Sequence, residues 1–433
     1  MVRRAILTLA LSALPLAANA QESAVASAQG GASTPSGAVA LGRALRRAGR
    51  FDEAVRALQP ATRSPATRAD AAWEIARVRF DQGNFRAAEA ACRAFPLARA
   101  ATDPRNLAQH VCMARAYLVW QRVALANRAI GLAGAIAPND GELQLVIADA
   151  RRLASEVPAS EAAYRLAAQS LPGRSEPYTG LGALYEIGRR FDEAGAAYHR
   201  AVEVDSADPS AQLALGRFLL RRRGDAAAAL PHLRAATAGR LHWPEALALL
   251  AQAQLDGGAP NEALGAAEEA ARLSPTTPGV QNALGRARIA VGQYTQAEAP
   301  LREAIRQVDN DALAWRSLAD VLEHTDRAAE AMQAWDAAID RSPTEVEGRL
   351  RAAELAARTT QYPLARAQLE RVLQDHPDSG PAQLLRARIA LAEGDRATAR
   401  QALDAANGRP GVSAEAIATL RAELERPVRR PRR

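Results

Sequence analysis

Six arginines form the most regular set of chemically active side chains in this chain of 433 residues. They recur at 34 residues, or at multiples of 34 with small corrections, and Trp73 lies four positions before one of them. A guanidinium group can hold a carboxylate or a phosphate through two parallel hydrogen bonds. The sequence therefore predicts that these arginines contact a ligand beside an apolar residue. The alternative, which remains open, is that they form ion pairs with acids on adjacent helices. The six are Arg43, Arg77, Arg115, Arg217, Arg286 and Arg388.

Motifs for catalysis, cofactors and metals are absent from the sequence. It has no Gly-rich phosphate loop, no H-E-x-x-H and no C-x-x-C, and its six histidines do not recur at metal-ligand spacing. The acidic pairs Asp52-Glu53 and Asp192-Glu193 lie in identical Phe-Asp-Glu-Ala segments, where carboxylates stabilise the start of a helix. We therefore predict no enzymatic activity, no catalytic residue, no cofactor and no metal site.

The arginine spacing belongs to a longer repeat, which predicts the elements that position these side chains. In each unit, positions 4, 7, 8 and 11 form an apolar stripe on a first helix, and positions 20, 24 and 27 form one on a second. Position 20 is Ser160 in one unit and alanine in ten, as close contact of two helix axes requires. Four extra residues precede the third unit, and one near residues 224–229 should lengthen a turn. The units start at residues 35, 69, 107, 141, 175, 209, 244, 278, 312, 346 and 380.

This pattern resembles the tetratricopeptide repeat, a helix-turn-helix unit of about 34 residues. The unit from Ser175 carries the resemblance best, with Tyr178, Leu181, Gly182, Tyr185, Phe191, Ala194, Tyr198 and Ala201. The resemblance implies an all-α, right-handed superhelical solenoid of about eleven repeats. It also implies that positions 2, 5, 9 and 12, which include the six arginines, line a concave binding face. The family's clamp for a chaperone peptide's carboxylate is absent, because position 6 lacks the residues it needs.

The two cysteines, Cys92 and Cys112, fall on helices that the repeat predicts to be neighbours. A disulfide between them is compatible with an exported protein, and two buried thiols are the alternative.

The ends of the chain have compositions unlike the repeats. Residues 1–20 resemble a secretory signal peptide, and residues 21–36 are small and polar, as in a flexible linker. We expect the solenoid over residues 37–411, a capping helix over 412–426 and a basic disordered tail over 427–433. No other segment is apolar enough to span a bilayer.

The net charge of +7 is concentrated at the ends, since Arg3 and Arg4 lie in the signal peptide and four arginines lie in the tail. The rest of the chain is nearly neutral, which argues against nucleic-acid binding. We expect an exported, periplasmic scaffold that binds a protein or peptide partner in its groove. The alternative is an accessory scaffold of envelope polysaccharide synthesis or export, whose arginines contact an anionic polymer.

Overall fold

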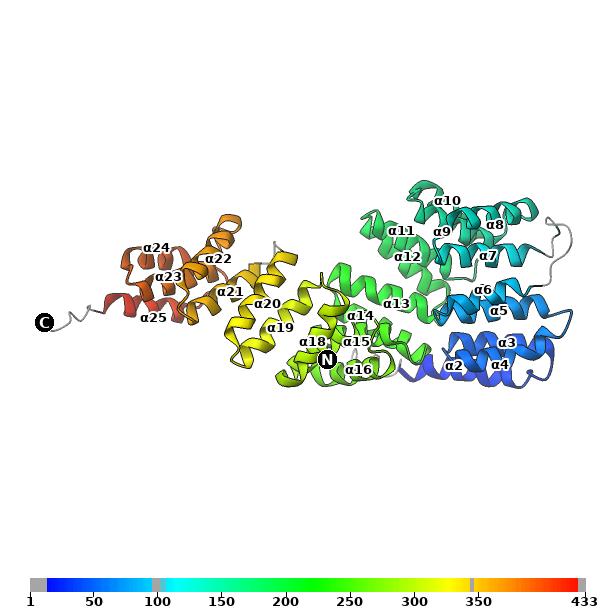
Figure 1. The fold of residues 1–433 in the computed structure, drawn as a ribbon, viewed down its shortest axis with the longest axis horizontal. Helices are drawn as coiled ribbons and strands as arrows, with labels where there is room; N and C mark the ends of the chain where they lie inside the picture. Colours follow the sequence, from blue (N-terminus) through cyan, green and yellow to red (C-terminus); the bar gives the residue numbers. More distant parts are fainter. Residues whose placement is uncertain (1–13, 96–102, 104–105, 343–345, 427–433) are drawn as a thin grey trace, which may run out of the picture. The chain divides into compact units, whose positions relative to one another are not determined.

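In the computed structural model, residues 14–95, 103, 106–342 and 346–426 are described, and their regular elements are all helices. Figure 1 shows these helices in chain order. They are α2 (Leu14–Gln29), α3 (Pro35–Arg47), α4 (Phe51–Thr62), α5 (Arg68–Asp81), α6 (Phe85–Arg93), α7 (Leu107–Val119), α8 (Val123–Ile136), α9 (Gly141–Leu153), α10 (Val157–Ser170), α11 (Glu176–Ile187), α12 (Phe191–Val204), α13 (Pro209–Phe218), the π-helical turn η2 (Leu219–Arg223), α14 (Ala226–Gly239), α15 (Pro244–Asp256), α16 (Pro260–Leu273), α17 (Val280–Ala290), α18 (Tyr294–Gln307), α19 (Ala312–His324), α20 (Ala328–Arg341), α21 (Val346–Arg358), α22 (Tyr362–Asp375), α23 (Gly380–Glu393), α24 (Arg396–Ala406) and α25 (Ala414–Glu425).

The described helices from α3 to α24 form eleven pairs, and the two helices of each pair pack against each other. This confirms the predicted fold class, an all-helical repeat solenoid with a capping helix. The cap is α25, which buries Ile417, Leu420 and Leu424 in a cluster with the residues of α24.

The chain divides into two compact units, Met1–Leu273 and Ser274–Arg433. The uniform repeat predicted one continuous domain and gave no sign of this division. The N-terminal unit contains the first seven helix pairs, and the C-terminal unit contains the other four with the cap.

Small residues at position 20 allow the two helices of each pair to approach closely. All eleven residues at this position are completely buried, including Ser160. The Ser160 hydroxyl donates a hydrogen bond of 2.8 Å to the carbonyl oxygen of Ala148 on the partner helix. The position is therefore restricted by backbone proximity, as the sequence predicted.

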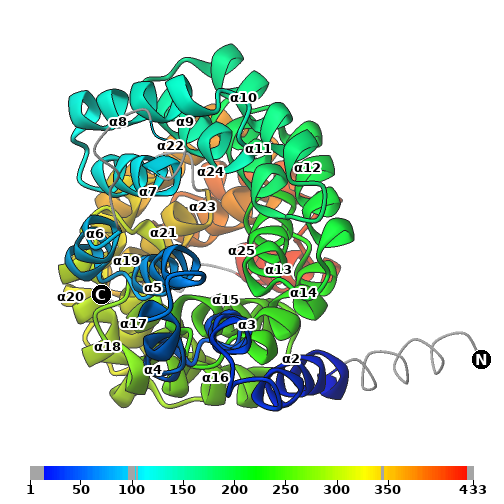
Figure 2. The same ribbon diagram turned by 90° about the vertical axis from the view of Figure 1, so that its right-hand side faces the viewer.

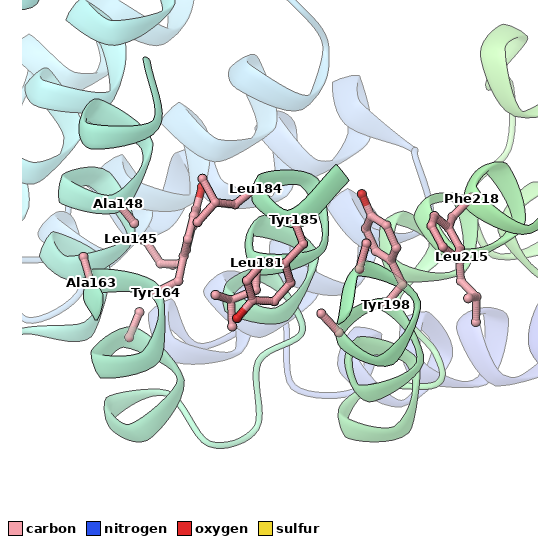
Figure 3. Packing of buried hydrophobic residues seen from close by; sticks show 13 residues of the cluster. Leu145, Ala148, Ala163, Tyr164, Leu181, Leu184, Tyr185, Tyr198, Leu215 and Phe218 are labelled. Carbon is pink, nitrogen blue, oxygen red and sulfur yellow. The ribbon is translucent and has the colours of Figure 1, made fainter. Parts of the chain in front are cut away.

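A glycine at position 8 receives a large side chain of the second helix. A Cβ atom placed on Gly182 would lie 2.5 Å from the ring of Tyr198. Tyr198 also packs against Phe218 of the next pair, with ring centroids 5.5 Å apart. Figure 3 shows this row of aromatic rings, from Tyr164 through Tyr185 and Tyr198 to Phe218. The row joins three consecutive pairs into one apolar cluster.

Two local features differ from the sequence expectations. Residues 21–29 are helical within α2, and Val25 is buried, whereas an irregular linker was expected over 21–36. The residue inserted in the sixth unit does not lengthen the turn, because the π-helical turn η2 takes it up at the end of the first helix. The insertion before Leu107 lies largely outside the described residues.

Candidate functional site

A cavity of about 620 Å³ lies inside the N-terminal unit. Its lining includes seven arginines and six acidic residues, together with Trp73 and Phe80. They come from α3, α5, α7, α9 and the segments around the starts of α11 and α13, and Arg240 follows α14. The charged lining residues are Arg43, Arg46, Arg47, Arg77, Arg115, Arg174, Arg240, Glu74, Asp81, Glu142, Glu176, Asp205 and Asp208.

The cavity exists because the N-terminal unit curves until its first and sixth pairs meet. Figure 2 shows helices α7 to α14 following a curve that returns toward α2 and α3, and α2 packs against α14. Arg240 donates a hydrogen bond of 2.8 Å to the carbonyl oxygen of Asp81, and its guanidinium lies over Phe51 and Trp243. Arg47 forms an ion pair of 3.5 Å with Asp205. These contacts close the unit on itself.

One group of ion pairs crosses the cavity from α5 to the starts of α9 and α11. Arg77 Nη2 donates to Glu176 Oε1 at 3.0 Å, and Arg77 Nη1 lies 3.8 Å from Glu142 Oε1. Arg174 donates to both Glu142, at 2.9 Å, and Glu176, at 2.6 Å. Arg115 Nη2 is 3.9 Å from the other carboxylate oxygen of Glu142. Both carboxylates lie in the first turn of a helix, where the helix dipole also stabilises negative charge.

A second group lies between α3 and α5. Arg43 Nε donates to Glu74 Oε1 at 2.8 Å, and Arg46 Nη1 donates to Asp81 Oδ2 at 2.7 Å. Arg46 Nε lies 3.4 Å from Glu74 Oε2. The Glu74 side chain is only 2% exposed, so its charge depends on these arginines.

Burial and charge together shift the ionisation of the cavity residues. Burial, with repulsion from Arg46 and Arg174, lowers the pKa of Arg77 to about 10. Burial acts to raise the pKa of Glu176, but hydrogen bonding and attraction from Arg174, with the charge of Arg77, lower it to about 2. Burial raises the pKa of Asp208, although a hydrogen bond from Ser175 opposes the change. Arg77 is thus a buried guanidinium that has both arginines and acids around it.

The structure brings together only part of the predicted arginine set. Arg43, Arg77, Arg115 and Trp73 line the cavity, and the three arginines are ion-paired. Arg217 lies in the same unit outside the cavity lining, 3.8 Å from Glu245. The remaining two belong to the C-terminal unit, where Arg388 borders an open cavity beside α25 and Arg286 lies on α17. Of the six predicted arginines, the four in the N-terminal unit, Arg43, Arg77, Arg115 and Arg217, form ion pairs within the protein.

Sequence reasoning missed the acids and four further arginines of the cavity, Arg46, Arg47, Arg174 and Arg240. Glu142 and Glu176 occupy position 2 of their units, and Arg46 occupies position 12, so the concave-face positions contained a signal for them. Arg115 pairs with the position-2 acid of the next unit, and Arg217 does the same. Arg174 and Arg240 lie in the segments that connect successive helix pairs, where the repeat pattern makes no prediction.

The two cysteines are joined in a disulfide between α6 and α7. The S–S distance between Cys92 and Cys112 is 2.04 Å, and the Cα atoms are 5.4 Å apart. Both side chains are completely buried beside Phe95 and Met113, so the bond links the second and third pairs within the apolar interior.

The described ranges contain neither a metal site nor a membrane-spanning helix. No group of three or more His, Cys, Asp or Glu residues is arranged there to hold a metal ion. Among the same residues, no helix combines the length and the apolar character that a membrane crossing requires.

The chain belongs to the tetratricopeptide repeat family, whose model matches residues 39–104, 183–239, 282–346 and 350–412. Repeats of this family generally mediate contacts between proteins, and their fold is typically non-catalytic. None of the curated proteins matches the chain.

Several solved structures resemble this fold at low sequence identity. The Cut9–Hcn1 hetero-tetramer of the APC/C is 13% identical, with 91% of this chain and 90% of that chain covered and a TM-score of 0.49. PilF of Pseudomonas aeruginosa is 22% identical, with coverage of 50% and 97% and a TM-score of 0.43. A tetratricopeptide repeat protein from Parabacteroides merdae is 18% identical, with coverage of 58% and 98% and a TM-score of 0.42.

Proposed function

We propose that this protein is a non-enzymatic scaffold that binds a protein or peptide partner through the charged cavity of its N-terminal unit. The observation that carries the proposal is the convergence of Arg77, Arg115 and Trp73 with six acidic residues at one cavity. Its volume of 620 Å³ falls within the range of about 300–1,000 Å³ that ligand sites occupy. Such a lining can contact both charges and the apolar groups of a polypeptide.

The mixed charge of the cavity favours a polypeptide over an anionic polysaccharide. Six acids are interspersed among the seven arginines, so a uniformly anionic polymer would meet like charges along the lining. An acidic glycan is therefore the second ligand class to test.

We also propose that the protein is exported and acts in the periplasm, as part of a cell-envelope assembly. Residues 1–20 have the composition of a signal peptide, and residues 1–13 lie outside the described structure. The disulfide between Cys92 and Cys112 adds support, because such bonds persist in oxidising compartments.

The proposal is tested by capture of partners with the tagged full-length protein from fractionated cells. The cavity variant carries Arg77→Ala with Arg115→Ala. The control carries Arg200→Ala with Arg272→Ala, two exposed arginines of the same unit that pair within their own helices. Circular dichroism first establishes that both variants are folded.

We expect the wild type and the control to capture the same protein from the periplasmic fraction. The cavity variant should capture at least about tenfold less, since a lost charged hydrogen bond costs about 1.5–3 kcal/mol. Undiminished capture by the folded cavity variant would contradict the proposal. Binding to an acidic glycan, without any captured protein, would support the alternative ligand.

A further inference from the structure

Both the basic and the acidic side chains of the cavity include buried polar atoms that have no hydrogen-bond partner among the described residues. Arg46 Nε is an unpaired donor, and Glu74 Oε2 and Glu142 Oε2 are unpaired acceptors. All three residues line the cavity. Leaving a buried polar atom without a partner costs free energy, because the atom has lost its hydrogen bonds to water.

The unpaired atoms do not satisfy one another. Arg46 Nε and Glu74 Oε2 are 3.4 Å apart but are not aligned as a hydrogen bond. Glu142 Oε2 is 3.9 Å from the nearest guanidinium nitrogen of Arg115, beyond hydrogen-bond distance. The fold therefore holds both signs of charge in position at the cavity, and three of the charged atoms make no hydrogen bond within the described part of the chain.

Arg77 indicates where a negative group would be stabilised. Its side chain is 12% exposed, and it lies among other guanidinium groups that repel it. A carboxylate placed between Arg77 and Arg46 would reduce this repulsion.

The carboxylates of the same cavity require the opposite charge. Glu74 and Glu142 each have one oxygen that accepts no hydrogen bond among the described residues. A ligand with only negative groups would leave these oxygens unpaired and would be repelled by them. Trp73 and Phe80 supply apolar surface between the charged groups.

We propose that the cavity binds a zwitterionic peptidic ligand, with a carboxylate directed to Arg46 and Arg77 and a protonated nitrogen directed to Glu74 and Glu142. This inference rests on the proposed function for the location of the site and adds the chemistry of its ligand. The two charges can come from the termini of a short free peptide or from the side chains of a protein segment.

Equilibrium dialysis with four synthetic peptide pools, read by mass spectrometry, tests the inference and separates these sources. Three pools are hexapeptides with blocked termini whose charged side chains are mixed, only acidic or only basic. The fourth contains tripeptides whose side chains are uncharged and whose termini are free, so that the two termini supply the only charges. The proteins are the full-length wild type, Glu74→Gln, Arg77→Met and the control Arg200→Ala.

We expect the wild type and the control to retain either the mixed hexapeptides or the free tripeptides at least about tenfold more than the acidic and basic pools. Retention of the mixed hexapeptides identifies a protein segment, and retention of the tripeptides identifies a small free ligand. Both Glu74→Gln and Arg77→Met should reduce this retention at least about fivefold.

Equal or greater retention of the acidic pool, especially if Glu74→Gln increases it, would overturn the inference in favour of a simple anion site. Retention of no pool would also overturn it. The proposed function fails separately: partner capture that depends on Arg77 and Arg115 without peptide retention preserves the scaffold function and removes only the zwitterionic ligand. If the peptides are retained but the cavity variant captures the partner as well as the wild type does, the zwitterionic ligand stands and the proposed role of the cavity in partner capture fails.

Discussion

At the residue scale, the arginines of the cavity combine structural and ligand-binding chemistry. Arg77 holds two helix-terminal carboxylates, while its burial and the nearby Arg46 and Arg174 lower its pKa. Its recurrence at position 9 could be seen in the sequence. Its pairing with Glu176 could not be seen there, since the two residues are 99 positions apart and no repeat rule joins them.

Substitution of Glu176 by glutamine should change the pH dependence of stability. The folded-state pKa of Glu176 is lowered to about 2, below the ordinary value of about 4.3. Its ion pairs therefore stabilise the fold fully above about pH 4.3, and this stabilisation disappears as the pH falls through 2. The side chain is 39% exposed, so solvent screening limits the effect to about 1 kcal/mol.

Urea unfolding of wild type and Glu176→Gln from pH 7 to pH 2 measures this effect. We expect the difference in unfolding free energy to be largest above about pH 4.3 and to approach zero near pH 2. Glu203→Gln, in an exposed pair with Arg200, is the matched control and should show little difference at any pH. A difference for Glu176→Gln that is independent of pH would contradict the assignment.

At the element scale, the repeat is determined by the few positions where two helices touch. Position 20 was predicted from the sequence alone, because backbone proximity allows only small residues there. The effect of the sixth-unit insertion was not predictable in the same way. A single extra residue can enter a loop or widen a helical turn, and the packing of Phe218 and Leu220 favours the second outcome.

Replacement of Gly182 by alanine should destabilise the protein although alanine is the better helix former. The added methyl group would overlap the Tyr198 ring, and such overpacking costs about 1–3 kcal/mol. The gain in helix propensity of about 1 kcal/mol offsets part of this. We expect a net loss of up to about 2 kcal/mol by urea denaturation.

Gly131→Ala provides the matched control, because Gly131 lies inside α8 and no atom would lie within 4 Å of the added Cβ. This variant should gain about 0.5–1 kcal/mol. Equal effects of the two substitutions would show that close packing at position 8 is unimportant.

At the scale of the whole molecule, eleven similar pairs produce two units with different interiors. The N-terminal unit closes around a charged cavity, and the closure depends on contacts between its first and sixth pairs. Gly49 allows this approach: a Cβ atom there would lie 2.9 Å from both Arg240 Cγ and the Leu241 oxygen.

Arg240→Ala should loosen the closed N-terminal unit without unfolding its helix pairs. Loss of the hydrogen bond to Asp81 and of the stacking on Phe51 removes two contacts between distant pairs. Hydrogen exchange with mass spectrometry should show faster exchange, by about tenfold, in α2, α3 and the end of α14. Helices α19 to α24 should be unchanged.

The control for this experiment is Arg341→Ala. Arg341 makes similar contacts, lying over Trp315 and donating to Asp309, but both residues belong to its own helix pair or to the segment just before it. Its removal should leave exchange in α2 and α3 unchanged. Unchanged exchange at these helices in Arg240→Ala would refute the role of Arg240 in closure.

The sequence by itself determined the helices, their pairing and the small residues between them, because each depends on contacts within a repeat or between neighbouring repeats. It also identified Arg43, Arg77 and Arg115 as residues of the inner face. The tertiary structure decided which charges meet. Small rotations between successive pairs accumulate until Arg77 reaches Glu176 and Arg240 reaches Asp81. That accumulated curvature is a property of the whole stack, and no single repeat encodes it.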